Sequence, residues 1–304
     1  MPGISTIKRY LSAEGLVKSY ERARPLSDNK APSTVKACHE RWQIDDMGAE
    51  EHLGIGHVIM MNIKDVKSNV YVGSEGKAVK HGKDHVNTKD YKDLLRKAFV
   101  LRGLPKEIQA DHGNFFYENH SKSPFPTNLH LWLLGLGIEL KWSRVYRPTD
   151  QAKVERCHRT LNSQMKKTTP YNDIKEFNES LQDRLLMWNQ YIPCDTFKQP
   201  PLVAFPEAIH SGRAYEINKE KELFSIEAIA NYLQKQVWYR KVASNRTISL
   251  GGHVYYIPNT KPKQELTITF DAKTLQLQFH YDNKLIVQKA SIGLDFESIA
   301  QLNT

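Results

Sequence analysis

The sequence predicts an α/β fold in which a mixed sheet is covered by helices and is followed by a small all-β barrel. Between residues 40 and 191, short apolar runs typical of strands alternate with amphipathic segments typical of helices. Between residues 237 and 292, only short alternating runs remain, and Gly-Gly, Pro-Asn and Asp-Asn turns separate them. The first pattern indicates strands joined by crossover helices. The second indicates a separate β module.

Each element of the mixed sheet follows from its own apolar pattern. Three strands over residues 42–45, 57–63 and 69–73 follow one another closely and are expected to form an antiparallel meander. The order then becomes helix 89–101, strand 107–110, helix 127–136, strand 138–142 and helix 150–167. A further helix over 174–191 carries one apolar stripe, formed by Phe177, Leu181, Leu185 and Trp188.

Three regions are expected along the chain. Residues 1–39 combine one short basic helix, over 5–17, with a polar linker. Residues 40–206 hold the mixed sheet and its helices, and the Pro-rich stretch 192–206 ends this domain. Residues 207–304 then form a linker helix and the β-barrel, whose strands are expected near 247–250, 253–257, 266–270, 275–279 and 285–287.

Composition narrows the class of protein. The 304 residues are 40% hydrophobic, which is enough for a buried core and excludes wholesale disorder. The three cysteines contain no Cys-x-x-Cys pair, so we expect neither a disulfide framework nor a cysteine-rich zinc site, and the compartment is expected to be reducing. No apolar run approaches the roughly 20 residues of a membrane span, so the sequence predicts a cytoplasmic protein without a membrane partner.

The charge points to a polyanion as the partner. Lys and Arg number 43 against 34 Asp and Glu, which gives a net charge of +9. The excess is clustered, with eight Lys or Arg between residues 141 and 167 and six, without any acid, between 228 and 264. Two basic patches suit a protein that follows a phosphate backbone, although two solvated faces would look the same. No Gly-x-x-x-x-Gly-Lys-Ser/Thr loop is present, which argues against an internal ATPase.

Three acids lie where elements of the predicted sheet converge. Asp45 lies on the first strand, on the face opposite Trp42 and Ile44. Asp111 directly follows strand 107–110, and Glu155 lies in the first turns of the last core helix. Three carboxylates at one edge of a sheet repel one another unless divalent cations hold them, and all-oxygen ligation favours Mg²⁺ or Mn²⁺.

Each acid also has a purely structural explanation. Asp45 could cap or pair locally, Asp111 could form an Asx turn before Gly113, and Glu155 could pair with Arg159. A register slip of one residue would put Asp46 in the place of Asp45. Asp65, after the second strand, is a weaker candidate and is expected to be a turn residue.

Three segments resemble a known family. Residues 42–45 (WQID), 111–115 (DHGNF) and 147–156 (RPTDQAKVER) are similar to the three signatures of the retroviral-integrase-type DDE transposase core. That core is an RNase H-like fold found in insertion-sequence transposases and retroviral integrases, and the resemblance covers residues 40–206. The third signature is the most specific, because Arg156, His158, Arg159 and Leu161 fall in register. It departs from the family at Ala152, where glycine is usual.

The resemblance implies a polynucleotidyl transferase. Asp45, Asp111 and Glu155 would hold two Mg²⁺ or Mn²⁺ ions for phosphodiester transesterification. The enzyme would cleave at transposon ends and then join the exposed 3′-hydroxyl to target DNA, without a covalent protein–DNA intermediate. The residues expected on the DNA-facing side of the core helix are Lys153, Arg156, Arg159 and Lys166.

The ends of the chain resemble the same group. Residues 4–11 look like the last helix of a truncated helix-turn-helix, and the terminal module looks like the β-barrel of phage Mu-type transposases, with DNA contacts expected from Arg240, Lys241 and Arg246. The partners would be DNA, as element ends and as target, and at least one further copy of the chain. Two alternatives stay open: a truncated or decayed non-catalytic DNA-binding protein, and a metal-dependent nuclease without strand transfer.

Overall fold

The computed structural model describes residues 34–80, 85–111, 113, 116, 118, 121, 123–144, 150, 152–165 and 170–301. The basic helix expected over residues 5–17 and the cation Lys166 lie outside these residues. Within them, no helix is both long enough and apolar enough to cross a membrane.

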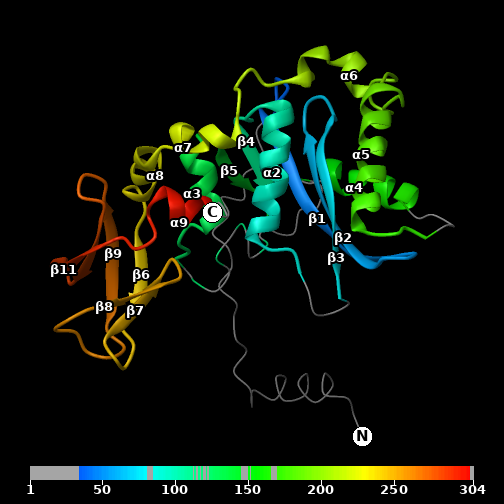
Figure 1. Ribbon diagram of the computed structural model, residues 1–304. Coiled ribbons are helices and arrows are strands. Elements are labelled where there is room, and N and C mark those ends of the chain that lie inside the picture. Colours follow the sequence, from blue (N-terminus) through cyan, green and yellow to red (C-terminus); the bar gives the residue numbers. More distant parts are fainter. Residues whose placement is uncertain are drawn as a thin grey trace, which may run out of the picture.

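A five-stranded mixed sheet forms the centre of the molecule (Figure 1). The strands β1 (Arg41–His52), β2 (Gly56–Asp65) and β3 (Tyr71–Val79) form an antiparallel meander. Strand β4 (Glu107–Ala110) pairs parallel with β1, and β5 (Glu139–Trp142) pairs parallel with β4, so the order is β3-β2-β1-β4-β5. The mixed α/β fold expected for an RNase H-like core is confirmed.

Helices cover both faces of this sheet, and local sequence signals begin three of them. Helix α2 (Thr88–Arg102) opens with a capping box, α3 (Asn128–Gly135) is capped by the Thr127 hydroxyl, and α5 (Ile174–Gln190) by the Asp173 carboxylate. Helix α4 (Ala152–Met165) precedes α5. Helices α2 and α3 lie on one face of the sheet, while α4 and α5 lie on the other.

Successive side chains of each strand point to opposite faces of the sheet, and a separate hydrophobic core lies on each face. On β1, Trp42 and Ile44 point into the larger core beneath α2 and α3. On β2, Val58 and Met60 point the other way and pack against the inner faces of α4 and α5. Odd-numbered β1 side chains therefore face α4, as the sequence predicted from Trp42 and Ile44.

The side chains of α5 occupy the open edge of β3. Asn189 accepts the backbone N–H of Tyr71 and donates to its carbonyl, at 2.8 and 2.9 Å. Asn178 does the same for Gly76, at 2.7 and 3.0 Å, and Gln182 donates to the Ser74 carbonyl. These amides pair with backbone groups of three β3 residues, as a neighbouring strand would.

Strand β3 runs to Val79, six residues beyond the predicted end, because β2 pairs with it as far as His57 opposite Val79. Helix α5 packs closely on this extension. A Cβ atom at Gly76 would lie 2.5 Å from Phe177 Cε1, so glycine allows helix and strand to pack at this point. We expect Gly76→Ala to lower the free energy of unfolding by about 1–3 kcal/mol through overpacking, as measured by urea unfolding. Gly48→Ala on β1, where nothing lies within 4 Å of the added atom, is the matched control. Equal stability of the two variants would contradict this packing.

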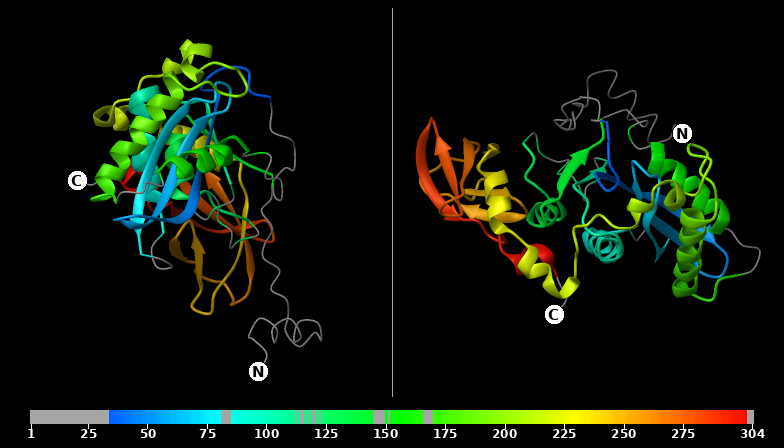
Figure 2. Two further views of the ribbon diagram at one scale, coloured as in Figure 1. Left: turned by 90° about the vertical axis from the view of Figure 1, so that its right-hand side faces the viewer. Right: turned by 90° about the horizontal axis from the view of Figure 1, so that it is seen from above.

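The C-terminal region contains the second β module. Strands β6 (Trp238–Lys241), β9 (Glu265–Asp271), β10 (Gln276–Tyr281) and β11 (Lys284–Ala290) form an antiparallel sheet in the order β11-β10-β9-β6. The hairpin of β7 (Thr247–Leu250) and β8 (His253–Tyr256) packs on it, with the rings of Tyr255 and Phe279 5.9 Å apart. This module lies at the opposite end of the molecule from α5 (Figure 2).

Short helices link the two parts. They are α6 (Pro201–Ala204), η2 (Pro206–Ile209), η3 (Ile217–Lys219), α7 (Glu220–Leu223), α8 (Ile226–Leu233) and, at the end of the described chain, α9 (Phe296–Ala300). Helices α8 and α9 both pack against α3 of the core.

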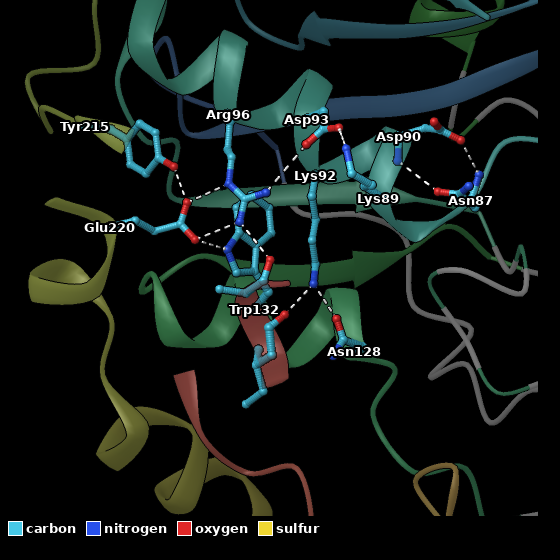
Figure 3. A network of polar contacts seen from close by, with 12 residues as sticks. Asn87, Lys89, Asp90, Lys92, Asp93, Arg96, Asn128, Trp132, Tyr215 and Glu220 are labelled. Carbon is cyan, nitrogen blue, oxygen red and sulfur yellow. Dashed lines mark hydrogen bonds and ion pairs between the residues drawn. The ribbon is translucent and has the colours of Figure 1, made fainter. Parts of the chain in front are cut away.

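A buried polar network fastens α7 and α9 to α2 (Figure 3). The Glu220 carboxylate accepts two hydrogen bonds from Arg96, at 2.8 and 2.9 Å, and one from the indole of Trp132 at 2.9 Å. Tyr215 donates a further bond to it. Arg96 also donates to the carbonyl of Ala300, at 2.8 Å, so α2, α3, α7 and α9 meet in one network.

Candidate active site on the sheet and helix α4

The register between β1 and β4 brings Asp45 and Asp111 together. In the parallel ladder Gln43 lies opposite Gln109. Asp45 follows Gln43 by two residues on β1, and Asp111 follows Gln109 by two residues, directly after the end of β4. Side chains two residues apart share a face, so both carboxylates lie on the face that Gln43 and Gln109 occupy. These two amides are 3.4 Å apart, which confirms their common face.

The same glutamines anchor the start of α4 above the acids. Gln43 and Gln109 both donate to the carbonyl of Asp150, at 2.6 and 3.1 Å. The Gln43 side-chain oxygen accepts the backbone N–H of Val154 at 3.4 Å. The first turn of α4 is therefore fixed against β1 and β4, and Glu155 belongs to that turn.

The pKa of Asp45 depends on its burial and on the neighbouring carboxylates. Burial raises the pKa of Asp45 to about 8. The charges of Asp111, Asp46 and Glu155 add to this rise in pKa. Asp111 and Glu155, the two other predicted acids, are therefore both close enough to act on Asp45.

Asp46 lies on the opposite face of the sheet. Its carboxylate accepts a hydrogen bond from the hydroxyl of Tyr91 on α2. Asp65 is a turn residue, as expected: it accepts the N–H of His39 at 2.8 Å and the N–H and hydroxyl of Ser68. Of these acids, only Asp45 shares its face with Asp111 and α4.

The local alternatives for Asp111 and Glu155 have different outcomes. Asp111 does accept the N–H of Gly113, at 2.7 Å, so the Asx turn exists, and it holds one carboxylate oxygen in place. Among the described residues, no ion pair forms between Glu155 and Arg159. Glu155 is half-buried and Asp111 is exposed, so both carboxylates can be reached from solvent.

The donor set fits a hard divalent cation in its chemistry. Within the described residues, no group of three or more His, Cys, Asp or Glu side chains is close enough to hold a metal ion. The three acids nevertheless offer only oxygen donors, which Mg²⁺ and Mn²⁺ prefer. Burial raises the pKa of Asp45, and the charges of Asp111 and Glu155 raise it further, so a cation bound beside these carboxylates would favour the ionised form of Asp45.

His158 is a neighbour of the acids to which the sequence assigned no role. It lies on α4 three residues after Glu155, and its Nδ1 is 4.0 Å from Oδ2 of Asp45. Burial lowers its pKa to about 4, so the imidazole is neutral at pH 7. The i, i+3 spacing from Glu155 was the signal that could have placed it here.

The predicted DNA-contacting cations divide into two groups. Arg156 and Arg159 on α4, and Lys241 and Arg246 in the β module, are exposed. Lys153 instead donates to the backbone carbonyl of Val66. Arg240 donates hydrogen bonds to the backbone carbonyl of Ser123, at 2.7 Å, and to the carboxylate of Glu118, at 3.2 Å.

The raised pKa of Asp45 predicts a cost in stability. In the unfolded chain this carboxyl ionises near pH 4, whereas in the folded chain it stays protonated to about pH 8. Folding stability is therefore lost as the pH rises from 4 to 8. In EDTA, we expect Asp45→Asn to match the wild type at pH 4 and to be more stable at pH 8, by several kcal/mol at about 1.4 kcal/mol per pKa unit. Urea unfolding at both pH values tests this, with Asp183→Asn on the exposed side of α5 as the control. A gain that did not depend on pH would contradict the acid cluster.

Comparisons with known proteins give similarity of fold alone. No protein-family model matches the chain. The catalytic core domain of HTLV-2 integrase in complex with magnesium is 13% identical over 55% of this chain and 95% of its own, with a TM-score of 0.40. A chain of the simian T-cell lymphotropic virus intasome is 13% identical over 96% of this chain and 95% of its own, with a TM-score of 0.45. The catalytic core domain of BIV integrase is 17% identical over 56% of this chain and 95% of its own, with a TM-score of 0.37.

Proposed function

We propose that this chain is a DNA transposase or integrase that cleaves phosphodiesters at element ends and joins the resulting 3′-hydroxyl to target DNA. The observation that carries the proposal is the shared face of Asp45 and Asp111 on β1 and β4, with the first turn of α4 anchored above it. A carboxylate from each of three elements at one accessible edge suits cation-dependent phosphoryl chemistry better than a structural role.

Each residue of the site has a separate task. Asp45, Asp111 and Glu155 would hold two Mg²⁺ or Mn²⁺ ions, which when bound activate an attacking oxygen and stabilise the leaving one. Gln43 and Gln109 fix the distance between the strands and α4. The neutral His158 packs beside Asp45 without adding charge, while Arg156 and Arg159 offer cations to the DNA backbone on the exposed side of the same helix.

A joining assay tests the function. Duplexes carrying the DNA that flanks this reading frame would be incubated with the protein and a target plasmid in Mg²⁺ or Mn²⁺. We expect joined products that require the cation and a free 3′-hydroxyl on the donor strand. Cleavage without joining would instead establish the nuclease alternative. DNA binding without cleavage or joining would establish the non-catalytic binding protein.

The exposed cations of α4 give a prediction about binding alone. Replacing Arg156 and Arg159 with Ala should weaken DNA binding and reduce the slope of log K against log salt by about one to two. Each arginine that no longer contacts a phosphate no longer displaces a counterion when DNA binds. Fluorescence anisotropy over a salt series measures this slope. The control replaces Lys175 and Arg184 on the exposed side of α5, which removes the same charge elsewhere. Equal slopes for the two variants would remove α4 from the interface.

A further inference from the structure

A cavity of about 330 Å³ lies beside α4, on another side of the helix from the acids. Its walls come from the β2–β3 turn, the first half of α4, the end of α5 and the segment 193–201. The volume falls at the small end of the ~300–1,000 Å³ range of ligand pockets. The residues that give it its chemistry are Lys64, Tyr71, Lys153, Arg156, Trp188 and Cys194.

Lys64 is a buried cation without an anion. Only 7% of the residue is exposed, and its ammonium lies 4.1 Å from the centre of the Tyr71 ring. Among the described residues, Lys64 forms no ion pair, and its ammonium is not one of the fully buried nitrogens that lack a partner, so it can be reached from the pocket. Burial lowers its pKa, and the charge of Arg156 lowers it further. A buried charge of this kind is costly unless a partner of opposite charge binds it.

The pocket as a whole is cationic. Lys153 and Arg156 line it together with Lys64, whereas its one lining acid, Asp195, is exposed. Lys153 gives one hydrogen bond to the Val66 carbonyl, so its position is fixed at the wall. An anion that entered would meet positive charge from two elements, β2 and α4.

Aromatic surface lies next to this charge. Trp188 lines the pocket from α5, and its N–H donates to the side-chain oxygen of Gln164 at 2.9 Å, which fixes the ring. Its centroid is 6.2 Å from that of Tyr71. Fixed aromatic rings beside cations are the combination that binds the bases and phosphates of single-stranded nucleic acid.

On the basis of the proposed function, we propose that this pocket binds one unpaired nucleotide of a DNA strand, with its phosphate on Lys64 and Arg156 and its base against Trp188. A DNA strand is favoured over a free small molecule because Arg156 directly follows Glu155 in the chain. The exposed Arg159 continues the cationic surface along the same helix. A nucleotide held here would fix the strand beside the acids.

Cys194 provides a direct reporter of occupancy. It lines the pocket, and its sulfur accepts a hydrogen bond from Asn69 at 3.6 Å. Burial raises the pKa of this thiol, but hydrogen bonds from Thr196, Phe197 and Asn69 outweigh burial and lower it overall. The other two cysteines, Cys38 and Cys157, have pKa values raised to about 12 by burial. Cys194 should therefore react first with N-ethylmaleimide at neutral pH.

The experiment measures alkylation of Cys194 by peptide mass spectrometry, using the full chain carrying Glu155→Gln in EDTA. The probes are a short single-stranded oligonucleotide, a blunt duplex of the same sequence, a deoxynucleoside monophosphate and inorganic phosphate. We expect the single strand to slow alkylation about 10-fold at ten times its Kd, and the blunt duplex to protect less. Lys64→Met should abolish this protection and keep the fold, because it removes a buried charge while retaining the length of the side chain.

Lys175→Met, at an exposed lysine of α5, is the matched control and should keep the protection. Protection of Lys64→Met equal to that of the wild type would overturn the proposal. Equal protection by inorganic phosphate would overturn the role of the base, and protection by the monophosphate alone would overturn the DNA strand as the ligand. The assay needs no catalysis, so a protein that protects Cys194 but joins no DNA would overturn the proposed reaction and leave the pocket standing.

Discussion

Glu155→Gln should reduce DNA joining by at least about 10²-fold while leaving the fold and the affinity for DNA unchanged. Gln keeps the shape of Glu but loses the charge that a divalent cation needs, and loss of one group that acts on the transition state typically costs 10²–10³-fold. The fold should survive because Glu155 is half-buried on the first turn of α4, which Gln43 and Gln109 hold in place independently. Joined products on a sequencing gel and anisotropy with the same duplex measure the two properties separately.

Asp46→Asn is the matched control for this experiment. Asp46 neighbours Asp45 in sequence but lies on the other face of the sheet, where Asn can still accept the Tyr91 hydroxyl. We expect Asp45→Asn to behave as Glu155→Gln and Asp46→Asn to keep its activity. Loss of joining in Asp46→Asn alone would show that β1 presents the other face to the DNA. Full joining by Glu155→Gln would overturn the catalytic assignment.

The central sheet could be predicted because its signals are local. Strand 107–110 and helix 174–191 were placed within one residue, since a short alternating run (EIQA) defines the strand and an apolar stripe with a 3.6-residue period defines the helix. The face of Asp45 also followed from alternation, because Trp42 and Ile44 can only point into the core. Strand β6 was missed because its four residues, WYRK, carry almost no alternation of apolar and polar side chains.

Features that depend on distant segments could not be predicted. The amides of α5 that satisfy the edge of β3 belong to residues more than 100 positions away, and nothing in their local sequence indicates a partner. Arg240 was expected to contact DNA, but its pairing with Glu118 spans 122 positions. The cavity beside α4 combines the β2–β3 turn with the segment 193–201 and depends on the same long-range packing.

The buried network around Glu220 gives the largest expected effect on stability. Glu220→Ala should lower the free energy of unfolding by about 3–5 kcal/mol, because it leaves the guanidinium of Arg96 buried without its carboxylate. The indole of Trp132 and the hydroxyl of Tyr215 lose their acceptor at the same time. Burial alone would raise the pKa of Glu220, but the bonds from Arg96, Tyr215 and Trp132 hold it below its ordinary value. The stabilisation is therefore present above about pH 4.5 and is lost as the pH falls through the lowered pKa.

Urea unfolding at pH 7 and at pH 3 measures this difference, which should shrink at the lower pH. The second variant, Arg96→Leu with Glu220→Ala, should regain part of the loss, since removing both partners leaves no unpaired charge. Hydrogen exchange adds a local test. Arg96 donates to the carbonyl of Ala300 and Lys92 to that of Ile299. Without Glu220, Arg96 is no longer held in place, so backbone amides of α9 should exchange faster in Glu220→Ala than in the wild type, before those of the central sheet do. If Glu220→Ala were as stable as the wild type, or if the double variant were the least stable, the network would not be what fastens the C-terminal helices to α2.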